Sequence, residues 1–214
     1  MNNILYIFFS WKGNIKKCYN RIVNMMSNIN YQHYIIVTGG EKETYFDNSK
    51  NRLYMKCNDF YEGLPEKVLE TFKYLYKNKW TEKYDYFCKL DDDMIIKNIL
   101  SLKKNTVHYT GYCILGDSAK KHLISRTWHF NKCTPGSYHD KRPYSGDFID
   151  FCAGGYGYVL SAHSIEQLKD AELCKEDILE DLTIAILLKK KHIIPTPANY
   201  KIWKKCMYSP EHGD

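Results

Sequence analysis

Residues 84–93 read YDYFCKLDDD, an apolar run that ends in three consecutive aspartates. Tyr84, Tyr86, Cys88 and Leu90 alternate along this run, and that period is typical of a β-strand. We therefore predict a central strand that places the three aspartates at its carboxyl end. Open α/β sheets bind their ligands at that end of their strands.

The three aspartates are the first candidate for chemistry. Adjacent carboxylates repel one another and raise one another's pKa values. A divalent cation relieves this repulsion, because Mg²⁺ and Mn²⁺ prefer oxygen ligands. We expect Asp91 and Asp93 to converge on one ion where the strand breaks into a turn. The alternative is an exposed acidic turn that caps the next segment.

Strand and helix patterns alternate on both sides of this run, and their order predicts an α/β fold. Pro65 suits the first turn of a helix. The weakly periodic segment Gly116–Asp150 is long enough to indicate a functional or mobile loop. We expect strands at Ile4–Trp11, Tyr34–Thr38, Arg52–Cys57 and Val107–Cys113, with a strand-like pair at Ile193-Ile194 before a basic tail. We expect helices at Asn14–Asn28, Leu64–Lys77, His163–Leu173 and Ile178–Lys191.

Composition limits the class of protein. The chain has 214 residues and a formal net charge of +6, which predicts one domain with an anionic ligand. That charge is too small to predict nucleic-acid binding. The eight cysteines contain no CxxC pair, so we expect buried reduced thiols. The apolar run Ile4–Trp11 is too short for a bilayer and lacks signal-peptide features, so we expect no membrane span.

Three further stretches carry candidate functional groups. Asp177 and Glu180 fit a D-x-x-E capping box, which would place Asp181 near a helix N-terminus, ionised and available as a base. The glycines of 153–157 permit close approach of a ligand or of another backbone segment, or else form a tight turn. His212 could complete a carboxylate metal site, or else be a solvated residue of the tail.

Four blocks in order resemble motifs of the inverting β-1,3-galactosyltransferase, N-acetylglucosaminyltransferase and Fringe superfamily. Residues 59–67, DFYEGLPEK, are similar to its D-x-Y-x-N-L-T-x-K block, with glycine and proline at the usual Asn and Thr. Residues 89–93, KLDDD, are similar to K-x-D-D-D. Residues 151–161, FCAGGYGYVLS, are similar to Y-C-S-G-G-G-Y-V-L-S with one inserted residue, and residues 180–182, EDL, are similar to E-D-V.

The resemblance implies a glycosyltransferase-A fold, a Rossmann-like α/β domain with a mixed central sheet, over residues 1–214. Residues 1–100 would form approximately the nucleotide-binding half and 101–214 the acceptor-binding half. The implied reaction is metal-dependent, inverting transfer of a sugar from a UDP-linked donor to a hydroxyl of a glycan or glycoprotein. Relatives mostly carry a membrane anchor and disulfides. The sequence shows neither signal, so we expect a soluble cytoplasmic enzyme, in the host cytoplasm if the chain is virus-encoded.

The resemblance also assigns roles to residues. Asp181 would be the general base. Trp128 matches a K-W-x element of the family in part, since Thr127 stands at the usual lysine. The other roles are metal ligands for Mn²⁺ (or Mg²⁺) at Asp91, Asp93 and His212; donor contacts at Ser10, Trp11, Asp59, Lys67, Asp91 and Asp92; and acceptor contacts at Trp128, Gly154, Gly155 and Glu180.

Two other functions stay open at this point. Asp91-x-Asp93 after an apolar strand also suits a metal-dependent phosphohydrolase with an aspartyl nucleophile, although Ile95 replaces the usual Thr or Val. A carbohydrate-binding domain that has lost turnover is the non-enzymatic alternative, against which the intact aspartates and Glu180-Asp181 argue.

Overall fold

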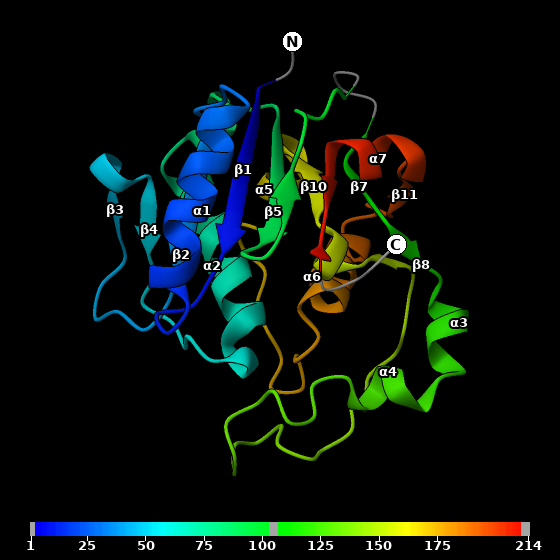
Figure 1. The fold of residues 1–214 in the computed structure, drawn as a ribbon. Coiled ribbons are helices and arrows are strands. Elements are labelled where there is room, and N and C mark those ends of the chain that lie inside the picture. The colour runs from blue at the N-terminus through cyan, green and yellow to red at the C-terminus, as the bar shows by residue number, and fades with distance from the viewer. Residues whose placement is uncertain (1–2, 103–106, 211–214) are drawn as a thin grey trace.

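One eight-stranded sheet runs through the computed structural model, which describes residues 3–102 and 107–210 (Figure 1). The strand order is β11-β7-β10-β5-β1-β2-β4-β3. The strands of this sheet are β1 Ile4–Phe9, β2 Tyr34–Thr38, β3 Tyr45–Asp47, β4 Arg52–Tyr54, β5 Tyr86–Asp91, β7 Tyr109–Gly111, β10 Tyr158–Ser161 and β11 Thr196–Pro197. The sheet joins strands from both halves of the chain, and the division near residue 100 stays a prediction.

The sheet is mixed, as predicted. Strands β5, β1, β2 and β4 are parallel, whereas β10 runs antiparallel to β5 and β7. Phe9 at the end of β1 lies opposite both Val37 and Asp91, so three strands end at the same edge. All residues of β1 are buried, because both faces of the sheet are covered. The prediction of a central strand that runs into the aspartates is confirmed.

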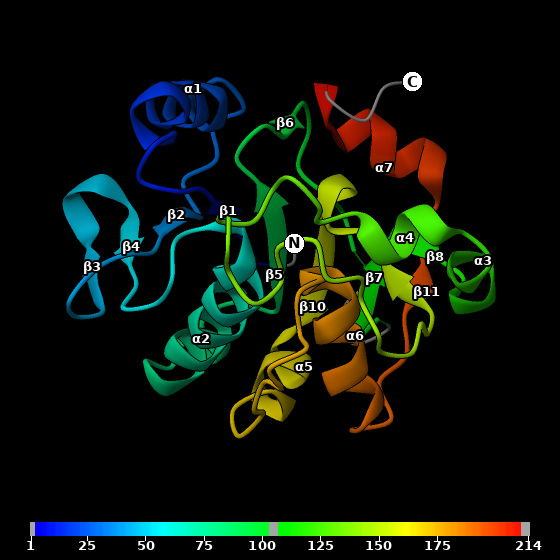
Figure 2. The same cartoon turned by 90° about the horizontal axis from the view of Figure 1, so that it is seen from below.

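Helices cover the sheet on two sides (Figure 2). Helices α1 and α7 share one apolar cluster with β1, and α2, α5 and α6 share the other. The spacing of apolar residues made α1 and α2 predictable, because each buries one stripe. The helices are α1 Ile15–Asn28, α2 Leu64–Lys77, α3 Gly116–Lys120, α4 Leu123–Thr127, α5 Ala162–Gln167, α6 Glu180–Lys189 and α7 Tyr200–Cys206. Short 3₁₀ turns are η1 Asn48–Lys50, η2 Tyr61–Gly63, η3 Trp80–Glu82 and η4 Gly154–Tyr156.

The C-terminal region differs from the prediction. Ile193 and Ile194 form no strand: Ile193 packs into the core, Ile194 is exposed, and the following Pro195 has no backbone N–H to donate. The edge strand is β11, which pairs with β7. The expected basic tail contains helix α7, which begins at an Asn199 side-chain cap and buries Trp203.

Other expected elements are shorter than predicted, because apolar residues continue beyond the backbone pairing. The strand expected at Val107–Cys113 is β7 alone, and the helix expected at His163–Leu173 is α5 alone. The expected capping box is wrong. Leu179 occupies the N-cap of α6, while the Asp177 carboxylate accepts from the Cys174 amide at 2.6 Å.

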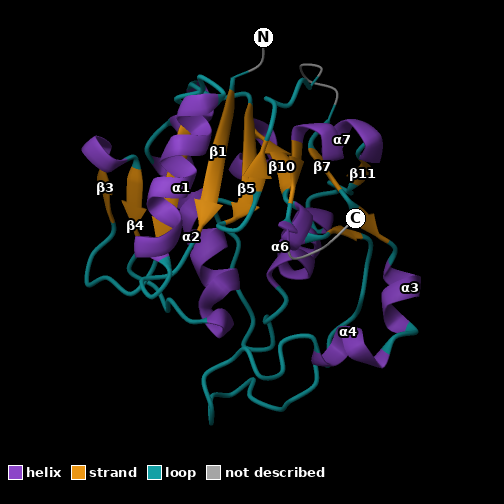
Figure 3. Cartoon of the chain, in the orientation of Figure 1, coloured by secondary structure: helices purple, strands orange, loops and turns teal. Residues whose placement is uncertain are grey.

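A long excursion extends beyond the carboxyl edge of the sheet (Figure 1). It leaves through β8 Cys113–Ile114, contains α3 and α4, continues as loop and returns through β9 Phe151–Cys152 (Figure 3). Strands β8 and β9 pair with each other, and β6 Ile95–Ile96 pairs with β12 Met207–Tyr208. The cysteines are free, and all except Cys174 are buried or partly buried, so their predicted burial holds except at Cys174. None of the described helices is long and apolar enough to cross a bilayer.

Candidate active site

Loops that follow the parallel strands meet at the carboxyl edge of the sheet. Ser10 comes directly after β1, and its hydroxyl donates to Asp92 Oδ2 at 2.5 Å. The Asn14 amide, just before α1, donates to the same oxygen at 2.7 Å. Because β1 and β5 are hydrogen-bonded neighbours, residues that are 82 positions apart in the chain lie in contact. The structure therefore brings together the predicted donor contacts Ser10 and Asp92.

The three aspartates face different partners. Asp91 Oδ1 lies 2.6 Å from Lys89 Nζ, whereas Asp93 Oδ2 accepts from the Ser209 hydroxyl at 2.5 Å. Among the described residues, no three His, Cys, Asp or Glu side chains gather as a cluster that could hold a metal ion. His212 lies outside the described residues. Convergence of Asp91 and Asp93 on one ion thus stays a prediction.

Lys89 lies at the centre of a buried charged cluster. Its side chain is 1% exposed, and its Nζ contacts Asp91 Oδ1, Glu180 Oε2 at 3.2 Å and the Gly154 carbonyl at 3.4 Å. Burial lowers the pKa of Lys89, but the charges of Asp91 and Glu180 outweigh it, so the pKa is raised overall. Lys89 is therefore a fixed cation that joins β5, α6 and the glycine turn η4.

Glu180 is the buried carboxylate of this cluster. Burial raises its pKa to about 7, against the opposing effects of Lys89 and of a hydrogen bond from Tyr158. The Tyr158 hydroxyl donates to Glu180 Oε1 at 2.5 Å. Both carboxylate oxygens therefore have internal partners, and the expected contact of Glu180 with an acceptor stays a prediction.

Asp181 lies in the first turn of α6 beside the cluster and is partly exposed. Its Oδ2 accepts from the Gly154 amide and its Oδ1 from the Leu182 amide, both at 2.9 Å. Burial raises the pKa of Asp181, and the two amide hydrogen bonds act in the opposite direction. A carboxylate that is held in one orientation with a raised pKa suits a general base.

The glycine turn requires its glycines. A Cβ on Gly154 would lie 3.0 Å from Glu180 Oε2 and 3.1 Å from Lys89 Nζ, so a side chain would press on the charged cluster. Gly155 follows in η4 and is partly buried. Gly157 has φ +72°, which favours glycine. The turn therefore lets backbone approach the cluster closely, as its sequence predicts.

Asp59 and Lys67 form a buried brace behind the donor loops. Lys67 is 3% exposed, and its Nζ lies 2.6 Å from Asp59 Oδ1 and 3.0 Å from the Ser10 carbonyl. Asp59 also accepts from the Gly39 amide at 2.6 Å and the Lys12 amide at 2.7 Å. The structure thus gives this pair a role in positioning the turns after β1 and β2, and their donor contact stays a prediction.

Two tryptophans are candidates for contact with a ligand, because their side chains are exposed. Trp11 and Trp128 are each 51% exposed. Lys132 Nζ lies 3.9 Å from the centre of the Trp128 ring and 5.5 Å from that of Tyr61. Burial raises the pKa of Tyr61, and the charge of Asp181 acts in the same direction.

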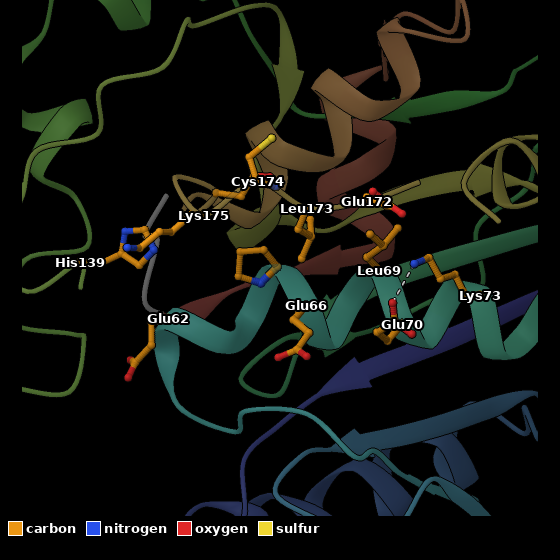
Figure 4. A pocket seen from close by; sticks show the side chains of 12 residues that line it. Glu62, Glu66, Leu69, Glu70, Lys73, His139, Glu172, Leu173, Cys174 and Lys175 are labelled. Carbon is orange, nitrogen blue, oxygen red and sulfur yellow. Dashed lines mark hydrogen bonds and ion pairs between the residues drawn. The ribbon is translucent and has the colours of Figure 1, made fainter. Parts of the chain in front are cut away.

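One pocket lies away from these residues. This pocket of about 420 Å³ lies along α2, and none of the predicted site residues lines it (Figure 4). Its acidic lining would repel a diphosphate, so we do not place the donor there. The labelled titratable residues of this pocket, apart from Cys174, are Glu62, Glu66, Glu70, Lys73, His139, Glu172 and Lys175.

Sequence reasoning missed Lys89 and Tyr158 as members of the site. A usable signal existed for Lys89, because a lysine inside a buried strand requires a nearby countercharge. Tyr158 carried no such signal, since tyrosine is common in strands. Its contact with Glu180 depends on the antiparallel placement of β10 beside β5.

Comparisons with known proteins place the chain in a family. No curated protein matches it. Protein A197 from STIV aligns over 92% of this chain and 81% of its own, with 11% identity and a TM-score of 0.46. A Bacillus anthracis protein, provisionally assigned as a glucose-1-phosphate thymidylyltransferase and solved with sucrose, aligns over 92% and 87%, with 9% identity and a TM-score of 0.44. The Galactosyltransferase family model matches residues 36–198, which include the three aspartates, the glycine turn and Asp181, and the chain therefore belongs to this family of glycosyltransferases.

Proposed function

We propose that this glycosyltransferase is metal-dependent and inverting, with UDP-sugar as donor and a hydroxyl of a glycan or glycoprotein as acceptor. The observation that carries the proposal is the placement of Asp181. Two backbone amides orient its carboxylate beside the Lys89 cluster, which connects it to Asp91 at the donor edge. A base on one side of the reacting sugar and a diphosphate on the other is the geometry of a single displacement, which inverts the anomeric carbon.

In the proposed reaction, Asp181 accepts the proton of the acceptor hydroxyl as its oxygen attacks C1 of the donor sugar, while the bond from C1 to the diphosphate oxygen breaks and UDP leaves. The amides of Gly154 and Leu182 keep the carboxylate aimed while it takes up the proton. Lys89 neutralises part of the negative charge of Asp91 and Glu180, which makes the approach of an anionic donor less unfavourable.

The aspartates fit a divalent cation by their chemistry. They offer hard oxygen ligands at a partly exposed turn, and the Asp91 side chain is 36% exposed. Asp91 and Asp93 would hold Mn²⁺ or Mg²⁺, and His212 is the candidate third ligand. A bound cation stabilises the developing charge of a leaving diphosphate.

The donor and acceptor assignments follow the same division of the site. Ser10, Trp11 and Asp92 would contact the nucleotide, with Asp59 and Lys67 supporting their loops. The glycine turn Gly154-Gly155 would contact the acceptor, because the Gly154 amide binds Asp181, and the exposed Trp128 is the other candidate for this contact.

Calorimetry and turnover together test the proposal. UDP should bind only when Mn²⁺ or Mg²⁺ is present. Asp181→Asn keeps an oxygen for the Gly154 amide, so it should fold and bind UDP normally while turnover falls by about 10²–10⁴-fold. Asp170→Asn, at an exposed position, is the matched control and should retain turnover.

Near-normal turnover of Asp181→Asn would refute the base assignment. Release of inorganic phosphate without sugar transfer would indicate the phosphohydrolase instead. Glycan binding that is indifferent to UDP and to the metal ion would indicate a carbohydrate-binding domain without turnover.

A further inference from the structure

Two free cysteines face each other where the long excursion leaves and rejoins the rest of the molecule. Cys113 of β8 is the direct antiparallel partner of Cys152 of β9, and their Sγ atoms are 3.5 Å apart. Directly opposed residues of an antiparallel pair have Cα atoms about 4.5–5.5 Å apart, which lies within the range that disulfides span. A bond of about 2.05 Å therefore needs side-chain adjustment rather than movement of the strands.

The two thiols differ in ways that assign them different roles. Cys113 is partly exposed, whereas Cys152 is fully buried. The hydrogen bond from the Cys152 thiol lowers the pKa of Cys113, and burial raises the pKa of Cys152. Thiolates are the attacking species in disulfide exchange, so Cys113 is suited to react first and Cys152 to react second.

The position of the pair gives a bond there structural consequences. Cys113 precedes α3 and Cys152 follows the loop, so a bond would close the whole excursion that carries Trp128 (Figure 1). The Cys152 amide also donates a hydrogen bond to the Tyr109 hydroxyl at 2.9 Å. Two residues further along the chain, the Gly154 amide donates to Asp181. The bond would form immediately beside the glycine turn.

We propose that Cys113 and Cys152 are a redox-active pair that closes to a cross-strand disulfide by exchange with a low-molecular-weight disulfide such as oxidised glutathione. The Cys113 thiolate attacks one glutathione sulfur, the S–S bond of glutathione breaks, and one glutathione leaves with a proton. Cys152 then loses its proton and attacks Cys113 Sγ, and the second glutathione leaves as a thiol. Two protein thiols are oxidised and one glutathione disulfide is reduced.

Oxidised glutathione is added to the folded full-length chain, which is then alkylated, digested without reductant and analysed by mass spectrometry. The expected product in the wild type is a peptide pair joined through Cys113 and Cys152. Cys152→Ser should stop at a glutathione adduct on Cys113, and Cys113→Ser should react much more slowly at Cys152. Cys174→Ser is the matched control, because Cys174 is exposed, and it should form the 113–152 bond like the wild type.

Thermal unfolding separates native pairing from pairing in unfolded chains. A bond formed in the native structure constrains the unfolded chain between residues 113 and 152, so oxidation should raise the melting temperature of the wild type and of Cys174→Ser, and should not raise that of Cys113→Ser. Two results would overturn the proposal. One is a wild type that accumulates only glutathione adducts, and the other is a 113–152 bond that leaves the melting temperature unchanged or lower.

Discussion

Replacement of Glu180 by Gln should change how the stability of the protein depends on pH. Burial raises the pKa of Glu180 from the ordinary 4.5 to about 7. The folded state therefore holds this proton more tightly than the unfolded chain. The resulting contribution to stability is complete below about pH 4.5 and is lost as the pH rises through about 7. The Glu180→Gln variant has no such proton, and its side-chain amide can still accept a hydrogen bond from Tyr158.

The magnitude follows from the two pKa values. Their difference, at about 1.4 kcal/mol for each pKa unit, corresponds to about 3–4 kcal/mol, of which about 3 kcal/mol falls between pH 4.5 and 8. The free energy of unfolding of the wild type, measured relative to Glu180→Gln, should therefore fall by about that amount between pH 4.5 and 8. Urea unfolding resolves the change, because a slope of about 3 kcal/mol/M converts it into a relative midpoint shift of about 1 M.

The comparison with Glu180→Gln cancels the titration of other groups, since they are present in both proteins. Glu176→Gln, at an exposed position, is the matched control, and its difference from the wild type should stay nearly constant over the same pH range. A wild-type minus Glu180→Gln difference that varies by less than about 1 kcal/mol would refute the buried, proton-retaining carboxylate.

Two stability predictions concern other parts of the site. Lys67→Met should lower the free energy of unfolding, measured in urea, by about 3–5 kcal/mol, because it leaves the largely buried Asp59 without its cation. Lys73→Met removes the cation of a more exposed ion pair and should lower the same quantity by less than about 1 kcal/mol. Equal losses of unfolding free energy in the two variants would contradict a stabilising role for the Asp59–Lys67 pair. Gly157→Ala should lower the melting temperature more than Gly136→Ala, because both have positive φ but only at Gly157 would Cβ lie 2.7 Å from a leucine carbon. Similar shifts would show that this close contact does not matter.

The local pattern of apolar residues was sufficient to predict the helices that bury one regular stripe and the strands that consist of one short apolar run. The bounds of α2 and of β2 agree with those predicted, since helical and strand periods appear directly in the order of residues. The run that ends in Asp91 was also recognisable as a central strand, because its apolar residues alternate with a period of two and lead directly into the aspartates.

Contacts between distant segments could not be predicted in this way. Glu180 was interpreted as a helix-capping residue, yet it is the buried partner of Lys89, and only the pairing of β10 with β5 places Tyr158 against it. Likewise, nothing local showed that Cys113 would lie opposite Cys152.

The sequence by itself determined the α/β class, the strand that delivers the aspartates to the sheet edge, and the family resemblance from which Asp181 is proposed as the base. Tertiary structure alone decided which charges are buried together, which loops the Asp59–Lys67 pair supports, and which thiols meet. The physical reason is that periodicity reports which face of an element is apolar. Burial, pKa and hydrogen bonding depend on neighbours that only the folded chain brings into contact.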